Sequence, residues 1–447
     1  MPKKISVAWF TITLLFLATA AWAQTSPPRT LSLDEAVQTA RANQPQLRQA
    51  RAGTEAARAR ADEVRAPLLP QVNATANYQR ATANRVVRPG ATPFSSTTPL
   101  SSSLTPSSRF DTFDFYNFGL GASQLVYDFG QATGRWKAAK ANAQAQADTE
   151  RATLLQVDLN VRVAYFNARA AKALLQVAQE TLSNQEGHFT QVQGFVQVGT
   201  QPEIDLAQAR TNLANARVQL INAQNGYETA KVQLNQAMGV EGPTNYDVVD
   251  EALPPIDNEN SPIEPLLEEA LKARPEFAAF SNQVRAQELT IRSIEGAYFP
   301  SLSVSTDLTK GGTGLGSLTW NWDANVLLSW PLFQGGLTRA QGREARANLT
   351  NLNAQVDAFR QEVRLEVDQA RLAVLAAKTS IGAAEEAVIN AKEQLRLAEK
   401  RYETGVGNII ELSDAQLALT NAEAQQVQAQ YNLASARARL LQALGRL

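Results

Sequence analysis

The 447-residue chain has no cysteine, a single histidine, His188, and a net charge close to zero. Without cysteine it forms no disulfide, no thiolate metal site and no lipid anchor on an N-terminal cysteine. One histidine on a polar helical stretch is typical of a solvated surface residue, because metal sites need several converging donors. The basic residues are spread evenly along the chain. This is not the basic stripe of a nucleic-acid-binding protein.

The chain also has no phosphate-binding loop, catalytic triad or cluster of metal-ligating residues. We therefore expect no enzyme, no catalytic residue, no metal and no cofactor. After the N-terminal region, no stretch approaches the roughly 20 apolar residues of a membrane helix. Any membrane contact must be made by strands or by the surface of an oligomer.

The N-terminal residues have the pattern of a secretory signal peptide. Lys3 and Lys4 precede the apolar run Val7–Ala20, and Ala21-Trp22-Ala23 places small residues at the minus three and minus one positions of a cleavage site. Residues 1–23 are therefore predicted to be removed, which leaves an exported chain with a net charge of −3 that begins near Gln24.

What the chain does contain is a duplication. A shift of 206 residues aligns Gly239 with Gly445 and the segments upstream of each. Nearer the start of each copy the shift becomes 230, so the first copy carries 24 extra residues between Tyr78 and Tyr116. A period of this length indicates a duplicated half-protein. The predicted divisions are a first repeat over 24–242, a linker over 243–262 and a second repeat over 263–447.

Most of the mature chain has the periodicity of long helices. From Leu154 to Val196, positions stepped alternately by three and four residues are apolar except Gln185, and the matching seam that ends at Tyr402 is polar only at Arg360. This heptad pattern predicts coiled-coil packing, and helices of about 65 residues span roughly 100 Å. Beside the long helix of each repeat, two shorter stretches are predicted to stack end to end: Leu33–Arg65 with Ile204–Met238, and Ile263–Glu295 with Ile409–Leu444.

Each copy also contains a stretch with the two-residue period of a β-hairpin. Apolar side chains alternate with polar or small ones in Val72–Gln79 and Tyr116–Ser123, and again in Ser301–Leu308 and Trp320–Trp330. The apolar faces end in aromatic residues, as in the girdles of membrane β-barrels. The predicted girdle residues are Tyr78, Tyr116, Phe118, Trp320, Trp322 and Trp330.

Each strand alone also fits a half-buried sheet in a soluble domain. Four such strands on an exported chain favour the barrel, yet about eight strands is the smallest number that closes one. Closure therefore requires an oligomer. The segments that join the strands of each hairpin, Asn84–Asp111 and Lys310–Gly314, are predicted to be exposed loops at the cell-exterior end.

The order of these elements in both copies resembles the TolC-type outer membrane efflux family, as do the motifs Val126–Gly130, Pro331–Gly336 and Arg401–Gly407. The resemblance covers essentially all of 24–447. It implies a fold that is mainly α with a small β part. Three chains would form a homotrimer, with long coiled-coil helices in a 12-helix α-barrel through the periplasm. Four strands per chain would form a shared 12-strand transmembrane β-barrel in outer membrane lipid.

By the same resemblance the protein is the exit duct of a tripartite efflux system that exports small molecules. Its partners would be a periplasmic adaptor protein and an inner membrane pump of the proton-driven or ABC type. Two alternatives stay open. One is the outer membrane duct of a type I protein secretion system, and the other is a poreless secreted coiled-coil tether, which explains the heptads but not the four strands.

The resemblance also implies roles at the periplasmic tip. Glu411 and Asp414 lie three residues apart on one helical face and match acidic positions that form rings at the constriction of the tunnel. The local alternative is helix capping by Asn408 together with Glu411. Tyr402 matches a tyrosine that hydrogen-bonds an aspartate, here Asp205, and helps to hold the tip shut.

This chain departs from the family in one turn, where Gly407 replaces an arginine and leaves Arg401 and Arg210 as candidates to take over its ion pair. Two tip loops match segments that meet the adaptor, although glycine is also an ordinary turn residue. The loop residues are Val198, Gly199, Thr200, Gln201, Thr404, Gly405, Val406 and Gly407.

Overall fold

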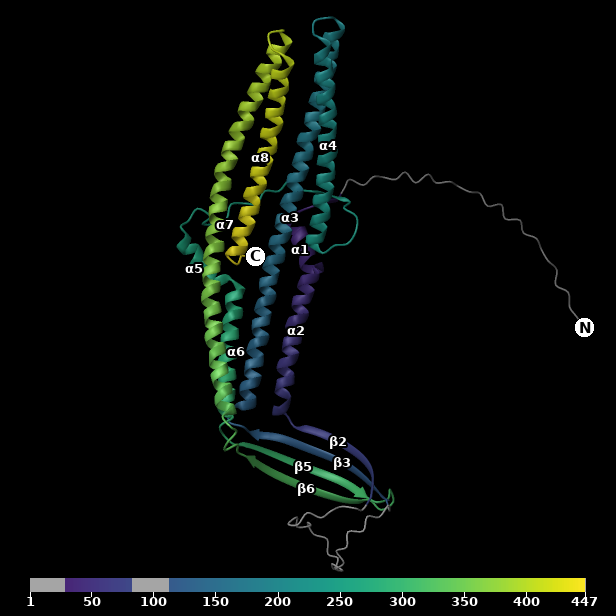
Figure 1. Cartoon of the computed structure of the whole chain (residues 1–447), viewed down its shortest axis with the longest axis vertical. Coiled ribbons are helices and arrows are strands. Elements are labelled where there is room, and N and C mark those ends of the chain that lie inside the picture. Colours follow the sequence, from purple (N-terminus) through teal and green to yellow (C-terminus); the bar gives the residue numbers. More distant parts are fainter. Residues whose placement is uncertain (1–28, 83–111, 447) are drawn as a thin grey trace, which may run out of the picture.

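The computed structural model describes residues 29–82 and 112–446 (Figure 1). Two helices of 67 residues, α3 (Gln131–Gln197) and α7 (Leu337–Glu403), run along most of the molecule. A four-stranded sheet lies at one end, and the turns of two helical hairpins form the other end, the tip (Figure 1). The predicted signal peptide and the loop Asn84–Asp111 lie outside the described residues.

Shorter helices pack beside the two long ones. They are α1 (Leu33–Asn43), α2 (Pro45–Arg65), α4 (Glu203–Met238), α5 (Ile263–Ala273), α6 (Pro275–Gly296) and α8 (Ile409–Ala443), with a 3₁₀ turn, η1 (Ala66–Leu68). In the first repeat α4 follows the tip half of α3 and α2 follows its sheet half (Figure 1), which confirms the predicted end-to-end stacking. Among the helices of the described chain, none has both the length and the apolar character needed to cross a membrane.

One expectation about the short helices was wrong. The stretches Leu33–Arg65 and Ile263–Glu295 are each divided in two, at Gln44 and at Arg274, which have extended ψ angles of 121° and 124°. The cause is the proline that follows each of them, because proline excludes the helical conformation from the preceding residue.

These breaks explain the shared glycine at the end of each repeat. Gly239 ends α4 with a φ of 68°, and a Cβ at this position would lie 2.7 Å from the Cα of Gln44. Gly445 follows α8 with a φ of 74°, and its Cβ would lie 3.0 Å from the backbone N of Arg274. Glycine is therefore required twice, for its left-handed conformation and for the close approach of two backbones.

The four predicted strands form one antiparallel sheet in the order β2-β3-β5-β6. Their bounds are β2 (Gln71–Thr82), β3 (Thr112–Tyr127), β5 (Ser301–Gly312) and β6 (Thr319–Ser329). Residues that are paired across neighbouring strands are of the same kind, so the alternation of apolar and polar residues is aligned across all four strands. One row of neighbours is Ala74, Leu120, Leu308 and Trp322, and the adjacent row is Asn73, Gly121, Asp307 and Asp323. One face of the sheet is therefore apolar and the other polar.

The sequence did not predict a second, smaller sheet in the middle of the molecule. Strand β1 (Arg29–Leu31) pairs in parallel with β4 (Tyr246–Val248), which lies inside the predicted linker 243–262. The buried Tyr165 of α3 closes this sheet, because its hydroxyl lies 3.2 Å from the carbonyl oxygen of Leu31 and 3.0 Å from that of Val249. We call this middle region the equator. It consists of α1, α5, the small sheet and the linker that ends at residue 262.

The main hydrophobic cores lie at the equator. In one, α1, β4, α4 and part of α8 cover α3 around Val157, Val161 and Phe166. In the other, α5 and α8 cover α7 around Val363 and Val367. Burying each of these large side chains contributes about 1.5–3 kcal/mol, so these two cores contribute strongly to the stability of the helical part.

A buried carboxylate fastens the linker to this core. Glu259 is 5% exposed, accepts two hydrogen bonds from Arg437 of α8 at 3.0 and 3.1 Å, and pairs with Lys378 of α7 at 2.5 Å. Burial acts to raise the pKa of Glu259, but the hydrogen bonds from Arg437 and Lys378 outweigh it and hold the pKa at about 2. The linker is therefore part of the packed structure.

Candidate functional site

The tip is formed by two helical hairpins that end in the same kind of turn. After α3, Gly199 adopts a φ of 77°, and the amide of Thr200 donates to the carbonyl of Phe195 at 3.0 Å. After α7, Gly405 adopts a φ of 72°, and the amide of Val406 donates to the carbonyl of Arg401 at 3.0 Å. Both are glycine-ended helix caps of the Schellman type. The two predicted docking loops are thus structurally equivalent.

The loops present apolar side chains at the end of the molecule. Val198 is 72% exposed and Val406 is 71% exposed. Gly407 turns back onto α7, where its amide donates to the carbonyl of Arg401 at 2.8 Å, and a Cβ would lie 3.0 Å from the Cβ of Arg401. A larger residue at 407 would push the loop away from the helix end.

A small hydrophobic cluster joins the two hairpins next to these turns, on the side toward the equator. Val192 of α3, Ala209 of α4, and Tyr402 with Leu412 of the α7–α8 hairpin pack together. Tyr402 is 2% exposed, so its ring is part of this cluster. The cluster is much smaller than the equatorial cores, and it contains residues from all four helices of the tip.

Tyr402 also makes a polar contact across the two hairpins. Its hydroxyl donates to Oδ2 of Asp205 in the first turn of α4, at 3.4 Å. Burial and the neighbouring carboxylate raise the pKa of Tyr402 to about 12, so the phenol stays protonated and remains a donor at neutral pH. Asp205 is itself 7% exposed. The hydrogen bond that the resemblance implied is thus present, while its role in gating stays a prediction.

The two acidic residues of α8 differ in their surroundings. Glu411 is exposed and pairs with Nε of Arg401 at 2.9 Å, and its backbone amide donates the predicted helix-capping hydrogen bond to Oδ1 of Asn408 at 2.8 Å. Asp414, also exposed, has no ion pair with any residue in 29–82 or 112–446. Arg401 therefore neutralises Glu411 within the same chain and leaves Asp414 as the freer charge.

Between the tip and the equator, the hairpins meet through polar side chains that the sequence did not single out as a set. Gln185 of α3 donates to Gln416 of α8 at 2.8 Å, and Asn212 of α4 donates to Ser413 of α8 at 3.0 Å. Gln416 is 8% exposed, and its Nε2 finds no partner in the described chain. One signal was available, since Gln185 is the single polar residue in the heptad seam of α3.

His188 is the second correction to the sequence analysis. It was expected on the solvated surface, but its side chain is only 18% exposed and its Nε2 lies 3.6 Å from Oε1 of Glu399 on α7. Burial lowers the pKa of His188, although Glu399 opposes this effect, so the imidazole is neutral at pH 7. The reason for the error is tertiary, because the second hairpin covers this face of α3.

Comparison with known proteins places this geometry in a family. Residues 36–240 and 266–446 match the family model described as outer membrane efflux protein. The chain belongs to this family. The two matched segments extend over most of both halves of the chain.

Two relatives support the assignment. The chain is 28% identical over 433 residues to the toluene efflux pump outer membrane protein TtgF of Pseudomonas putida. This match covers 92% of the present chain and 82% of the relative. It is 26% identical over 447 residues to the outer membrane protein TolC of Escherichia coli, with 93% and 82% covered. A crystal structure of a membrane protein from Pseudomonas aeruginosa has the same fold, with a TM-score of 0.78, 23% identity, and 93% and 90% covered. The predicted family, outer membrane location and efflux function are confirmed.

As expected for an outer membrane efflux protein, aromatic residues line the apolar face of the sheet. Five of the six predicted girdle residues lie toward the end far from the helices, where the rings of Tyr78 and Tyr116 pack in a tilted arrangement with centroids 5.0 Å apart and Trp320 is 73% exposed. Trp330 lies at the helical end, just after β6, and donates to the carbonyl of Tyr298 at 3.2 Å. Their role as a girdle stays a prediction.

A second apolar band surrounds Trp330, and the sequence analysis missed it. Phe333 is 89% exposed and Leu332 is 81% exposed. Phe129 stacks on Phe299 with ring centroids 4.9 Å apart. The signal that could have revealed this band is the pair of motifs between strand and helix, Val126–Gly130 and Pro331–Gly336, which contain Phe129, Leu332 and Phe333.

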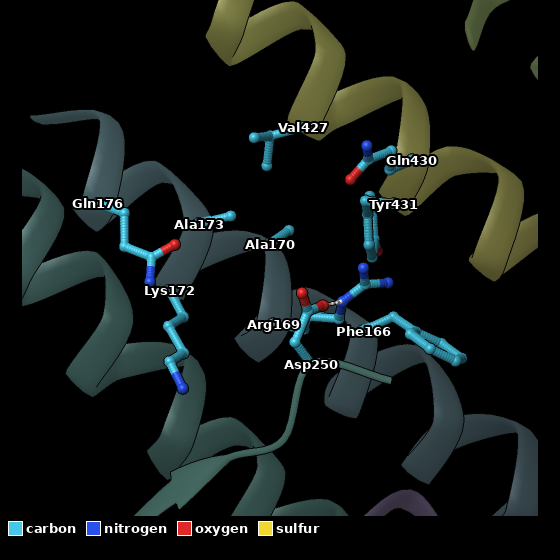
Figure 2. Close-up of a pocket in the computed structure, with 10 residues that line it drawn as sticks. All are labelled: Phe166, Arg169, Ala170, Lys172, Ala173, Gln176, Asp250, Val427, Gln430 and Tyr431. Atoms are coloured by element: carbon cyan, nitrogen blue, oxygen red, sulfur yellow. Dashed lines mark hydrogen bonds and ion pairs between the residues drawn. The ribbon is translucent and has the colours of Figure 1, made fainter. Parts of the chain in front are cut away.

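A partly open cavity of about 140 Å³ lies at the equator between α3, α8 and the linker (Figure 2). Its charges are already paired: Arg169 forms an ion pair with Asp250, and Lys172 pairs with Asp247 at 2.6 Å. Figure 2 shows Gln176, Gln430 and Tyr431 on the remaining walls. Among residues 29–82 and 112–446, no three imidazole or carboxylate groups converge to hold a metal ion.

Proposed function

We propose that three copies of this outer membrane efflux protein assemble into a continuous duct. The observation that carries the proposal is the sheet, which has an apolar face across all four strands and two edges, β2 and β6, without a neighbour in the described chain. In lipid, unpaired strand edges are excluded because their backbone groups would lose their hydrogen bonds. Pairing β6 of one chain with β2 of the next would remove every edge, and three chains would give twelve strands.

The helical part supports the same assembly. Helix α2 leads into the outer strand β2 and α7 follows the outer strand β6, so the contact that closes the sheet would also bring these helices together (Figure 1). Helix α7 is partly uncovered in one chain from its sheet end to its middle, since Leu337, Leu365 and Leu372 are 53%, 57% and 51% exposed. A helical barrel would bury such residues between protomers.

We place the duct as the exit of a tripartite efflux system for small molecules. A relative named as part of a toluene efflux pump supports an apolar small-molecule cargo. The equivalent loops at the tip, with exposed Val198 and Val406, would receive the periplasmic adaptor, and the adaptor would connect the duct to an inner membrane pump of the proton-driven or ABC type. Asp414 and Glu411, repeated three times, would form the acidic constriction.

Single-channel recording tests this proposal. The purified mature protein, shown to be trimeric in detergent by light scattering, is inserted into a planar bilayer with asymmetric salt. We expect a small, cation-preferring conductance, because a nearly closed acidic tip limits the current. A folded, inserted protein that is monomeric and carries no current, even when Tyr402 and Asp205 are replaced, would contradict the duct and favour a poreless tether.

A further inference from the structure

A basic groove lies between α3 and α6, near the sheet. Its volume is about 660 Å³, and its wall contains four basic side chains against one carboxylate. The residues that the argument uses are Trp136, Lys137, Lys140, Arg285, Glu288 and Arg292. This concentration of positive charge is unexpected for a chain with a net charge of −1 and evenly spread basic residues. The fold gathers side chains that lie about 150 positions apart.

The positive charges of the groove have no partner among the residues that the structure describes. Lys137, Lys140, Arg285 and Arg292 make no ion pair or hydrogen bond with a residue in the two described segments of the chain. The equatorial cavity is different, because its Arg169 and Lys172 are both paired. Four cations held near each other repel one another, so a bound anion would stabilise the groove.

The walls of the groove are held rigidly at both ends. Near the sheet, the hydroxyl of Ser293 donates to the carbonyl of Gln131 at 2.7 Å, and the helices approach so closely that a Cβ on Gly134 would lie 2.8 Å from the Cβ of Ser293. At the other end, Asn282 donates to Asp148 at 2.8 Å. The basic side chains between these contacts are therefore presented by a preformed site.

The duplication provides an internal comparison. Under the shift of 230 residues, Arg285, Glu288 and Arg292 of α6 correspond to Glu55, Arg58 and Asp62 of α2, so the sign of each charge is reversed. Under the shift of 206, Lys137 and Lys140 correspond to Arg343 and Arg346, which stay basic. Helices α7 and α2, which are the duplicated counterparts of α3 and α6, therefore carry charges of both signs at these positions. In α3 and α6 all of these positions are basic except Glu288.

The groove would stay accessible in the assembled duct. Helices α3 and α6 follow and precede the central strands β3 and β5, whereas assembly would use the outer strands β2 and β6. Lys137 lies six residues into α3, and Arg292 lies four residues before the end of α6. These positions are about 9 and 6 Å from the sheet end of their helices, so the groove opens close to the membrane.

We propose that the groove between α3 and α6 binds a phosphate group, with Arg285 and Arg292 on one wall and Lys137 and Lys140 on the other. Guanidinium groups suit the planar pairs of oxygens on a phosphate, and ammonium groups add charge without directional demand. Trp136, over which Arg65 lies at 5.5 Å, adds a flat apolar side to the groove. The phosphate would belong either to an anionic phospholipid or to a free solute.

Two binding measurements test the proposal on the full mature protein in detergent. Native mass spectrometry with added phosphatidylglycerol, compared with phosphatidylcholine, measures the lipid source. Calorimetry with glycerol 3-phosphate measures the free source. We expect the double variant Lys137→Gln, Arg285→Gln to lower the affinity for the phosphate-bearing ligand about tenfold or more. Binding of phosphatidylglycerol alone identifies a lipid site, and binding of both probes identifies a site for the phosphate itself.

The control is the double variant Arg339→Gln, Arg343→Gln, which removes the same charge from exposed positions near the same end of α7, outside the groove. It should bind like the wild type. The proposal is overturned if neither probe binds, or if both double variants lose affinity equally while circular dichroism shows both to be folded. Equal binding of phosphatidylglycerol and phosphatidylcholine by wild type and groove variant would overturn it as well.

Discussion

The equator and the tip are built from the same long helices, but they are held together in different ways. At the equator, additional elements cover the helices, and a buried carboxylate is paired with two cations, as in the contact of Glu259 with Arg437 and Lys378. At the tip, the two hairpins share one small cluster, a 3.4 Å hydrogen bond from Tyr402 to Asp205, and neutral amide contacts.

This difference indicates where the molecule can move. Separating the hairpins at the tip would expose one small cluster and break a few hydrogen bonds that water can replace, each with a net value of about 0.5–1.5 kcal/mol. Separating the elements of the equator would expose two hydrophobic cores and leave buried charges without partners. We therefore interpret the equator as the fixed joint and the tip as the part that opens.

The largest effect is expected from breaking the equatorial ion pairs. Glu259→Gln leaves Arg437 and Lys378 without their buried carboxylate, and we expect a loss of about 3–5 kcal/mol in the free energy of unfolding. Denaturant unfolding followed by circular dichroism measures it. The control is Glu393→Gln, which removes an exposed pair with Arg396 within α7 and should leave the midpoint unchanged. Equal midpoints for both variants would show that the linker is not fastened by Glu259.

The same carboxylate predicts a pH dependence. Its pKa is about 2 in the folded chain, below its ordinary value of 4.5, so its contribution is complete above pH 4.5 and is lost as the pH falls from 4.5 towards 2. Unfolding midpoints measured between pH 7 and pH 3 should fall less in Glu259→Gln than in the wild type. Parallel curves for the two proteins would show that other groups cause the acid sensitivity.

Two glycines with the same backbone conformation compare the regions directly. Gly239→Ala at the equator would place a Cβ 2.7 Å from the Cα of Gln44, whereas Gly199→Ala at the tip has no atom within 4 Å. Both variants lose about 1 kcal/mol in the free energy of unfolding, because alanine disfavours the left-handed conformation. The equatorial variant loses about 1–3 kcal/mol more through overpacking. Thermal unfolding should rank them in this order. The reverse order would contradict the packed joint.

At the tip, the hydrogen bond between the hairpins is the next test. Tyr402→Phe together with Asp205→Ala removes a hydrogen bond that stabilises the closed arrangement by about 1.5 kcal/mol. The ratio of open to closed channels should therefore rise roughly tenfold. Single-channel recording gives this ratio. The control is Tyr431→Phe at the equatorial cavity, which should leave it unchanged. An unaltered open fraction in the double variant would remove Tyr402 and Asp205 from the gate.

The smallest expected effect concerns the acidic residues, which should change ion selectivity with little change in stability. Because Arg401 neutralises Glu411 at 2.9 Å, Asp414→Ala should weaken cation preference more than Glu411→Ala. Reversal potentials under asymmetric salt measure the preference. A control that removes two exposed acids of the other hairpin, Glu186→Ala with Glu203→Ala, should have less effect. An equal shift would show that the tip as a whole, and not the α8 pair, sets the preference.

Much of the fold could be predicted because its signals are local. Heptad spacing determined the long helices, two-residue alternation determined the four strands, and Pro45 and Pro275 set the helix breaks once their effect on the preceding residue is considered. The shift that aligns Gly239 with Gly445 also followed from the residues alone. Each of these features depends on neighbours within about two helical turns or on direct self-comparison.

The remaining features were decided by the tertiary structure, because they join residues that lie on different helices. His188 is buried only where α7 covers α3, and Arg401 takes Glu411 only because the α7–α8 turn brings them to 2.9 Å. The basic groove arises in the same way, from two helices whose charges look scattered along the sequence. Periodicity shows which face of a helix is buried, but the partner across that face is determined by how the two repeats pack together.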